Sequence, residues 1–360
     1  MRICFISLGN FSHIGLYLDY FKQAGHDVHL IALSPGPERN ISVHNVGFGK
    51  KYSATEGKWK YPLSMPGAKK LIKKLKPDIV HAHYATSAGL TALYCGFHPT
   101  VITVHGSDLT VGIKSRVWRP VLKRIFNFCD CINTVSKDLE DMALSLGIEP
   151  DKIETLTPGI DTEKFAFIKN PEANRSGALK LICTRRMEPV FDHKTIIDAL
   201  VLLKEKGISF EMTFTGDGSL LEEFKQQAEE IGLSNHVTFT GRVPNYKLPE
   251  LLSKHDVYLS ASLWDGASLS LLEAMSVGLF PVVSDIKANS AWLKKNTDGL
   301  LHKVDDAQDL AEKIQYLNEN RRIIIEAAKE NRKKVVESAD RKTNMKHLEG
   351  IYEKLIDKRR

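Results

Sequence analysis

The chain has 360 residues, of which 42% are hydrophobic and 26% are charged, as is typical of soluble globular proteins. This length is too great for one ordinary hydrophobic core, so we expect two domains. No apolar run approaches the roughly 18 residues of a membrane-spanning helix, and we expect none. The net charge of +6 lies in the first half, where residues 1–160 hold 19 Lys and Arg against 13 Asp and Glu.

The cysteines and the first residues indicate a reducing compartment. The start, "MRICFISLGN", turns polar at once and lacks a small-residue cleavage site, so it predicts a buried strand rather than a signal peptide. The five cysteines are scattered and odd in number, which argues against a disulfide framework or a zinc site. We therefore expect a cytoplasmic protein. The cysteines are Cys4, Cys95, Cys129, Cys131 and Cys183.

Short apolar runs alternate with amphipathic stretches through the first half of the chain. Strands are predicted at 2–9, 27–33, 78–84, 100–108 and 130–136, and helices at 14–25, 65–77, 119–129 and 137–147. This alternation is typical of a parallel sheet with helices on both faces. Ligands of such sheets bind beyond the carboxyl ends of the strands, where several of these runs become polar.

A second alternating series begins near Leu179. Strands are predicted at 178–184, 209–218, 236–243, 256–262 and 280–285, and helices at 193–207, 220–232, 248–255 and 269–278. The segment 153–177 is rich in Pro, Gly and polar residues and predicts a hinge and linker. We therefore expect two doubly wound α/β domains, 1–163 and 164–340, facing a cleft. The charged amphipathic helix 341–360 is expected to pack back towards the first domain.

The stretch "SLWDGASLSLLEAMSVGLFPVVSD", residues 262–285, holds two acids that helix packing does not need. Asp265 lies in the turn after a predicted strand, and Glu273 lies on the helix that follows. The free N–H groups of such a turn bind anions, whereas the two carboxylates suit the hydroxyl groups of a sugar or ribose. The residues alone leave a second interpretation open, in which Asp265 caps the helix and Glu273 is an ordinary helical acid.

The wider pattern resembles the retaining glycosyltransferases of family 4. An acid, seven intervening residues and then Glu-Ala-Met, Gly and Pro-Val-Val resemble the Glu-x7-Glu signature of that family. Further similar motifs occur in the expected order and extend the resemblance over nearly the whole chain. They are "TVHGSD" at 103–108, "LTPGIDTEKF" at 156–165, "FTGDGSLLEEF" at 214–224 and "FTGRVPNYKLPELLSKHDVYLSAS" at 239–262. The resemblance implies the GT-B architecture of two Rossmann-like domains.

The resemblance also implies roles for particular residues around a nucleotide-sugar donor. Glu273 would hold the ribose hydroxyls, and Asp265 would contact the transferred sugar at a position where the family usually has Glu. The remaining implied contacts with the nucleotide sugar come mostly from backbone groups, and Asn10 and Ser12 offer hydrogen-bond donors beside Gly9. They are Gly266, Ala267 and Ser268 for the sugar or diphosphate, Arg242 and Val243 for the base, and Gly9, with Asn10 and Ser12, for the diphosphate.

The phosphate-binding pair of the family is altered in this chain. The family usually has an Arg followed five residues later by a Lys, and that spacing selects Arg186 but places Phe191 at the Lys position. Arg185, His193 or Lys194 could supply the missing charge. An arginine suits a diphosphate because its planar donors match the oxygen atoms. We expect Arg186, with Arg185, to stabilise the leaving diphosphate.

His105 follows a predicted strand and is the remaining catalytic candidate. It could hydrogen-bond a sugar hydroxyl or stabilise charge near the anomeric carbon, or it could cap the strand as a structural residue. Asp108 is a plausible partner or helix cap. The pair His81 and His83 looks like two metal ligands, but no partner ligand is evident, and we expect neither a metal nor another cofactor. The segment 216–219, "GDGS", predicts a tight turn.

The predicted function is transfer of a sugar, from a UDP-sugar by expectation, to a glycan or polyprenyl-diphosphate-linked acceptor in surface polysaccharide synthesis. The basic clusters at 49–62, 68–77 and 114–124 favour contact with the anionic inner leaflet, or an ordinary solvated surface. Nucleic acid is not expected, because no binding motif accompanies the charge. The alternatives are a nucleotide-sugar epimerase of the same architecture and a non-catalytic nucleotide-sugar-binding protein. The full Gly-x-Gly-x-x-Gly pattern of a dehydrogenase is absent.

Overall fold

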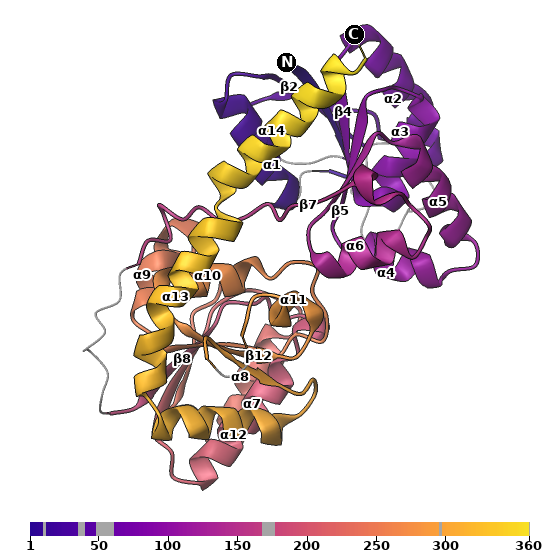
Figure 1. Ribbon diagram of the computed structural model, residues 1–360. Coiled ribbons are helices and arrows are strands. Elements are labelled where there is room, and N and C mark those ends of the chain that lie inside the picture. The colour runs from indigo at the N-terminus through magenta and orange to yellow at the C-terminus, as the bar shows by residue number, and fades with distance from the viewer. Residues whose placement is uncertain (10–11, 35–39, 48–60, 168–176, 295–296, 360) are drawn as a thin grey trace. The chain divides into compact units, whose positions relative to one another are not determined.

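The computed structural model describes residues 1–9, 12–34, 40–47, 61–167, 177–294 and 297–359. The chain forms two compact units (Figure 1). Unit 1 comprises Met1–Pro158 and Lys342–Arg360, and unit 2 comprises Gly159–Arg341. The corresponding boundaries predicted from the sequence are residues 163 and 340. Among the described residues, none of the helices is long and apolar enough to cross a membrane.

Unit 1 is built on a parallel sheet with strand order β3-β2-β1-β4-β5-β6-β7. The order reverses between β1 and β4, so the carboxyl ends of these two strands form a topological switch point. The strands are β1 Arg2–Ser7, β2 Asp27–Ala32, β3 Ser42–Asn45, β4 Ile79–His83, β5 Thr100–Val104, β6 Cys131–Thr134 and β7 Ile153–Thr155. The helices are α1 Ser12–Gln23, α2 Tyr61–Leu75, α3 Leu90–Cys95, α4 Ser107–Lys114, α5 Trp118–Phe128, α6 Lys137–Leu144 and α14 Arg341–Asp357.

The predicted alternation of strands and helices is confirmed, but four elements of unit 1 were not predicted: the strands β3 and β7 and the short helices α3 and α4. The short edge strand β3 was not predicted, because its four residues are only partly buried and lack an apolar run. Residues 153–155 were assigned to the linker but form the other edge strand, β7, which pairs with β6. These two missed strands are edge strands, which have one neighbour and therefore need less apolar sequence than central strands.

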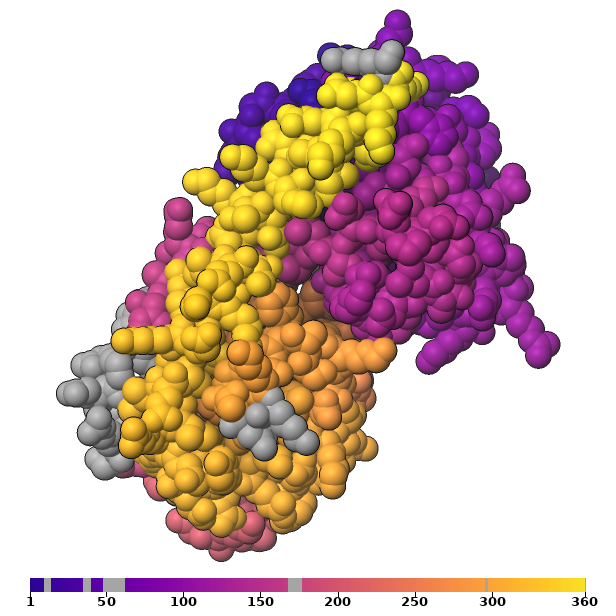
Figure 2. Space-filling view, viewed as in Figure 1, coloured from indigo at the N-terminus to yellow at the C-terminus, as the bar shows by residue number. Residues whose placement is uncertain are grey.

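The C-terminal helix α14 completes the core of unit 1. Its apolar residues recur every three or four positions and enter the same cluster as Phe5 of β1 and Phe21 of α1. Polar contacts fix its position, because His26 bonds Glu349 at 2.6 Å and the Tyr352 hydroxyl bonds His81. Figures 1 and 2 show α14, in yellow, lying across unit 1 beside α1. A segment distant in sequence thus covers one face of the sheet.

Unit 2 repeats the plan with strand order β10-β9-β8-β11-β12-β13, again parallel, and with a switch point between β8 and β11. The strands are β8 Leu179–Cys183, β9 Phe210–Phe214, β10 Val237–Phe239, β11 Val257–Ser260, β12 Phe280–Ser284 and β13 Leu300–His302. The helices are α7 His193–Glu205, α8 Leu221–Glu230, α9 Leu248–Ser253, α10 Leu269–Val277, α11 Lys287–Ser290, α12 Ala307–Glu319 and α13 Arg322–Ala339.

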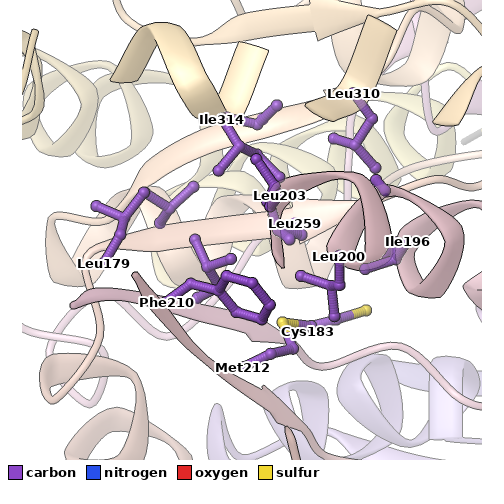
Figure 3. Packing of buried hydrophobic residues seen from close by; sticks show 14 of the residues in the cluster. Leu179, Cys183, Ile196, Leu200, Leu203, Phe210, Met212, Leu259, Leu310 and Ile314 are labelled. Carbon is purple, nitrogen blue, oxygen red and sulfur yellow. The ribbon is translucent and has the colours of Figure 1, made fainter. Parts of the chain in front are cut away.

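Both faces of the unit 2 sheet are buried. On one face, Leu179 and Cys183 of β8 pack with Leu200 of α7 and Ile314 of α12 (Figure 3). On the other face, Tyr258 of β11 belongs to a second cluster with residues of α10 and α13. Burial on both sides explains the nearly continuous apolar strands seen in the sequence. It also fixes the two central strands, β8 and β11, whose ends carry the candidate site.

The role of α14 gives a stability prediction. We expect Tyr352→Ala to destabilise unit 1 by about 3–5 kcal/mol, because the ring is fully buried and stacks on Phe21 with ring centroids 5.0 Å apart. Urea unfolding followed by circular dichroism measures this change. The exposed Lys354 on the same helix is the control, and Lys354→Ala should change stability by less than about 0.5 kcal/mol. A loss below about 1 kcal/mol for Tyr352→Ala would contradict this account of α14.

Candidate active site

The switch point of unit 2 brings an arginine and an acid together. Arg185 lies two residues beyond β8, and Asp265 lies in the loop between β11 and α10. Because β8 and β11 are parallel neighbours, both loops leave the same edge of the sheet. The Nη2 atom of Arg185 donates to Oδ2 of Asp265 at 2.6 Å, and the two side chains are only 11% and 15% exposed. The pair is therefore largely removed from water.

Two further contacts hold the Arg185 guanidinium. Its Nη1 donates to the Ser270 hydroxyl at 2.9 Å, and that oxygen also accepts a bond from the Tyr258 hydroxyl at 3.0 Å. The ring of Phe191 lies 4.1 Å from the guanidinium carbon, which is a cation–π contact. At the position where the family resemblance expects Lys, this chain therefore has a ring that packs against Arg185 and adds no charge.

Arg186, which the motif spacing selected, lies in different surroundings. Its side chain is 62% exposed and forms ion pairs with Asp217 at 2.9 Å and Glu188 at 3.1 Å. The turn predicted at "GDGS" contains Asp217 and brings it beside Arg186. A Cβ on Gly218 would lie 2.2 Å from the Met187 carbonyl oxygen, so glycine is needed for the turn to approach the backbone beside Arg186. The structure thus brings Arg185, and not Arg186, to Asp265.

Glu273 is half-buried on α10, one turn beyond Ser270. Burial raises the pKa of its carboxyl to about 7, although the nearby charges of Arg341, Lys164 and Arg185 act in the opposite direction. A carboxyl in an apolar setting with cations nearby is a strong hydrogen-bond acceptor in its charged form and a donor in its neutral form. Such a group can bind hydroxyl groups.

The loop between Asp265 and α10 offers backbone donors. Ser268 occupies the N-cap of α10, so Asp265 is not the cap residue, and the Ser268 side chain makes no capping bond. Gly266 and Ser268 are buried, and Ala267 is half-buried. The first N–H groups of a helix have no partner within it, which makes this end of α10 favourable for an anion.

Arg242 and Val243 follow the edge strand β10. The carbonyl oxygen of Gly241 accepts a bond at 2.9 Å from the N–H of Gly216, so this segment adjoins the "GDGS" turn. Arg242 is exposed, and Val243 is half-buried. The contacts of Arg242 and Val243 with the base of the nucleotide stay a prediction.

The candidates of unit 1 lie at the carboxyl ends of β1, β4 and β5. Nε2 of His105 lies 2.9 Å from Nδ1 of His83, and the Tyr84 ring centroid lies 4.6 Å from that of His105. Asp108 is buried, which raises the pKa of its carboxyl, and it accepts bonds of 2.8 Å from the N–H groups of Ala85 and Gly106. Asp108 therefore fixes the loops that present His83 and His105.

The other residues of unit 1 singled out in the sequence are the segment around Gly9 and the histidine His81. Gly9 is described and its carbonyl oxygen accepts a bond from the Ser7 hydroxyl, but Asn10 and the side chain of Ser12 lie outside the described residues. His81 bonds Thr103 at 2.6 Å, and burial lowers its pKa to about 3, so it is a neutral core residue. In the described part of the chain, no three His, Cys, Asp or Glu side chains cluster as metal ligands.

The sequence did not predict three of the contacts in these clusters. Ser270 and Phe191 flank Arg185, and His83 contacts His105. Only His83 left a usable signal, since it ends one strand and His105 follows the neighbouring strand. The other two contacts depend on the direction in which Arg185 leaves the sheet.

Comparisons with known proteins identify the class. The sequence pattern of "Glycosyltransferase Family 4" matches residues 12–164, and that of "Glycosyl transferases group 1" matches residues 164–341. The two matches meet at residue 164 and together span both units. The chain therefore belongs to the family 4 type of glycosyltransferases, and it is a transferase with the GT-B fold.

Individual relatives agree with this assignment. EpsD of Bacillus subtilis is 25% identical over 368 residues, which cover 95% of this chain and 92% of that protein. The Escherichia coli UDP-Gal:alpha-D-GlcNAc-diphosphoundecaprenol alpha-1,3-galactosyltransferase is 27% identical, covering 79% of this chain and 77% of its own length. The crystal structure of Anabaena HepE in complex with UDP superposes with a TM-score of 0.80 at 16% identity, covering 99% of this chain and 100% of that one.

The raised pKa of Glu273 predicts how pH affects the stability of unit 2. Between about pH 4.5, the ordinary value, and about pH 7, the folded state holds a proton that the unfolded chain has lost. Stability must therefore fall as pH rises through this window, by up to about 3 kcal/mol, and the loss persists above it. We expect Glu273→Gln to match the wild type near about pH 4 and to exceed its free energy of unfolding at about pH 8.

Urea unfolding at the two pH values measures the difference. Glu229→Gln, at an exposed acid of the same unit, is the control and should follow the wild type at both values. Equal stability of Glu273→Gln and the wild type at about pH 8 would show that burial of Glu273 carries no such cost.

Proposed function

We propose that this glycosyltransferase moves a sugar, with retention of configuration, from a UDP-sugar to a glycan or lipid-linked acceptor in surface polysaccharide synthesis. The observation that carries the donor site is the Arg185–Asp265 pair at the switch point of unit 2, beside Glu273 and the N-terminus of α10. UDP as the nucleotide is supported by the names of two similar proteins, the galactosyltransferase that uses UDP-Gal and HepE in complex with UDP.

The proposed donor site divides into parts of different chemistry. Glu273 accepts hydrogen bonds from the ribose hydroxyls, and Asp265 accepts them from the transferred sugar. Backbone N–H groups of Gly266, Ala267 and Ser268 bind the sugar or diphosphate, with the helix dipole adding attraction. Asp265 is one methylene shorter than the family's usual Glu and is held by Arg185, so it reaches less far towards the sugar.

Arg185 is the proposed diphosphate-binding arginine. During transfer, the bond between the anomeric carbon and the diphosphate oxygen breaks, the acceptor hydroxyl oxygen forms the new bond to that carbon, and its proton passes to the departing diphosphate. Negative charge then develops on the diphosphate, and a fixed guanidinium stabilises it without needing to reorganise. Ser270 and the Phe191 ring keep the guanidinium in place. Arg186 remains a secondary candidate, because it already pairs with Asp217 and Glu188.

The acceptor and the location are inferred from the relatives and from unit 1. The Escherichia coli relative acts on a diphosphoundecaprenol-linked sugar, and a lipid-linked acceptor would place this enzyme at the cytoplasmic face of a membrane. His105, held by His83, is proposed to act near the anomeric carbon. No bound metal is proposed for the reaction, since the named contacts to the diphosphate come from arginine and backbone donors.

The donor class can be tested by thermal unfolding across a panel of UDP-, GDP-, ADP- and dTDP-sugars without added metal. A ligand that binds the native state raises the unfolding midpoint by mass action. We expect a rise with UDP-sugars that is lost in Glu273→Ala and retained in Glu229→Ala. A rise with another nucleotide alone would replace UDP in the proposal, and no rise with any of them would remove the donor site.

A pair of adjacent arginines provides the sharpest test of the diphosphate site. We expect Arg185→Ala to lower kcat by about 10²–10³-fold, as when one transition-state donor is removed. Arg186→Ala should lower it by less than about fivefold, because that side chain is exposed and paired elsewhere. Transfer to an acceptor, assayed by product formation, distinguishes the enzyme from an epimerase or a binding protein. Equal losses in the two variants would contradict the assignment of Arg185.

A further inference from the structure

Three adjacent helices of unit 1 contain no acidic residue, and two of them, α2 and α5, are strongly basic. Helices α2, α3 and α5 together contain seven Lys and Arg and no Asp or Glu. They lie side by side, because α3 packs against both α2 and α5. We call α2, α3 and α5 the basic layer. Its uniform sign ends at α6, which carries Asp138, Glu140 and Asp141.

The basic layer covers the face of the sheet opposite α14. The apolar residues of α1 and α14 pack on Phe5 and Val101, whereas a Cβ on Gly89, beside α3, would touch Ile125 of α5 and Ile102. Val101 and Ile102 are consecutive strand residues, so they point to opposite faces. The helices of the α14 side are mixed in sign, with acids at Asp19, Glu349 and Glu353 among others.

The cations of the basic layer are available to an outside partner. Lys70, Lys73, Arg119 and Arg124 are exposed, and in the described part of the chain no carboxylate forms an ion pair with any of them. Lys69 differs from these four cations because it is only partly exposed and donates to the Tyr94 carbonyl oxygen at 3.2 Å. Unpaired charges of one sign on one face attract an extended anionic surface more strongly than scattered charges do.

Exposed apolar side chains accompany these cations. Leu63 is 56% exposed and lies on the same outward stripe of α2 as Lys70, two turns away. Val117 is 73% exposed at the N-cap of α5, next to Trp118 and Arg119. Tyr94 is 46% exposed at the end of α3. Exposed aliphatic side chains among Lys and Arg match the boundary between headgroups and acyl chains, and Leu63 and Val117 therefore favour a bilayer over a nucleic acid or a soluble polyanion.

We propose that the basic layer docks unit 1 on an anionic lipid bilayer. The phospholipid headgroups pair with the Lys and Arg side chains, and Leu63 and Val117 enter the headgroup boundary. The docking surface continues through Val111 of α4, which is 69% exposed, towards the start of α4 beside His105. Because α4 has eight residues, its length is about 12 Å, so docking would hold a lipid-linked acceptor near His105. This last step rests on the proposed function, whereas the docking itself does not.

The test is co-sedimentation of the full chain with vesicles of neutral phosphatidylcholine, alone or mixed with phosphatidylglycerol, without donor or acceptor. We expect binding to the mixed vesicles only, weakening as salt is raised. Replacing Lys70, Lys73, Arg119 and Arg124 by Gln should weaken it by more than about tenfold. The matched control replaces Lys22, Lys342, Lys346 and Lys354 of α1 and α14 by Gln and should bind as the wild type does.

Two further measurements test the apolar contacts and the folding of the variants. The double variant Leu63→Ser and Val117→Ser, with every charge intact, should also bind less, because apolar insertion is part of the proposal. Each variant is used only if its thermal unfolding midpoint equals that of the wild type. Equal binding by the two charge variants, or displacement of the protein from vesicles by RNA at equal phosphate concentration, would overturn the proposal. Binding of UDP-sugar in every variant keeps failure of docking distinct from failure of the proposed function.

Discussion

The parallel pairing of β8 with β11 is the constraint on which the candidate active site depends. These strands are neighbours in space but are separated in the chain by two other strands, because the order of the sheet reverses between them. Their carboxyl ends therefore lead into loops on opposite sides of the sheet, and ligands of doubly wound sheets bind at such a switch point. Arg185 and Asp265 lie on these two loops, 2.6 Å apart, and meet only because the strands are adjacent.

The environment of the Arg185–Asp265 pair explains why it persists. Removing two charges from water is costly, and their attraction alone often fails to offset the cost. Here the Ser270 hydroxyl accepts a second bond from the guanidinium and the Phe191 ring packs against it, while its buried Nε has no hydrogen-bond partner among the described residues. The result is a cation fixed in direction, beside an acid and the N-terminus of α10. Burial raises the pKa of Glu273, whereas Asp265 is paired with Arg185, so the two acids have different environments. Different environments allow the two carboxyls to take different roles.

In unit 1, contacts between side chains hold the histidines at the strand ends. Its histidines lie at the ends of adjacent strands, where His81 is fixed by Thr103 and Tyr352, and His83 by His105. Burial keeps His81 uncharged, so it serves the core, and α14 contributes to the arrangement through Tyr352. The helices on the other face of the same sheet carry the uncompensated positive charge. One unit thus combines a neutral, hydrogen-bonded His81 in its core with one layer of helices that carries cations and no acids.

The sequence by itself determined the α/β class, the two units, the family and the pair of acids at 265 and 273. Periodicity and motif order are local, so they survive without coordinates, and the burial of central strands on both faces made them easy to see. Only the tertiary structure decided which of two adjacent arginines meets Asp265, that Phe191 packs on it, and that α2, α3 and α5 form one surface without acids. The physical reason is that neighbouring side chains on an irregular loop point in directions set by partners far away in the chain. Motif spacing counts residues along the chain, whereas the contact of Arg185 was fixed by a strand some 75 residues further on, through the sheet order.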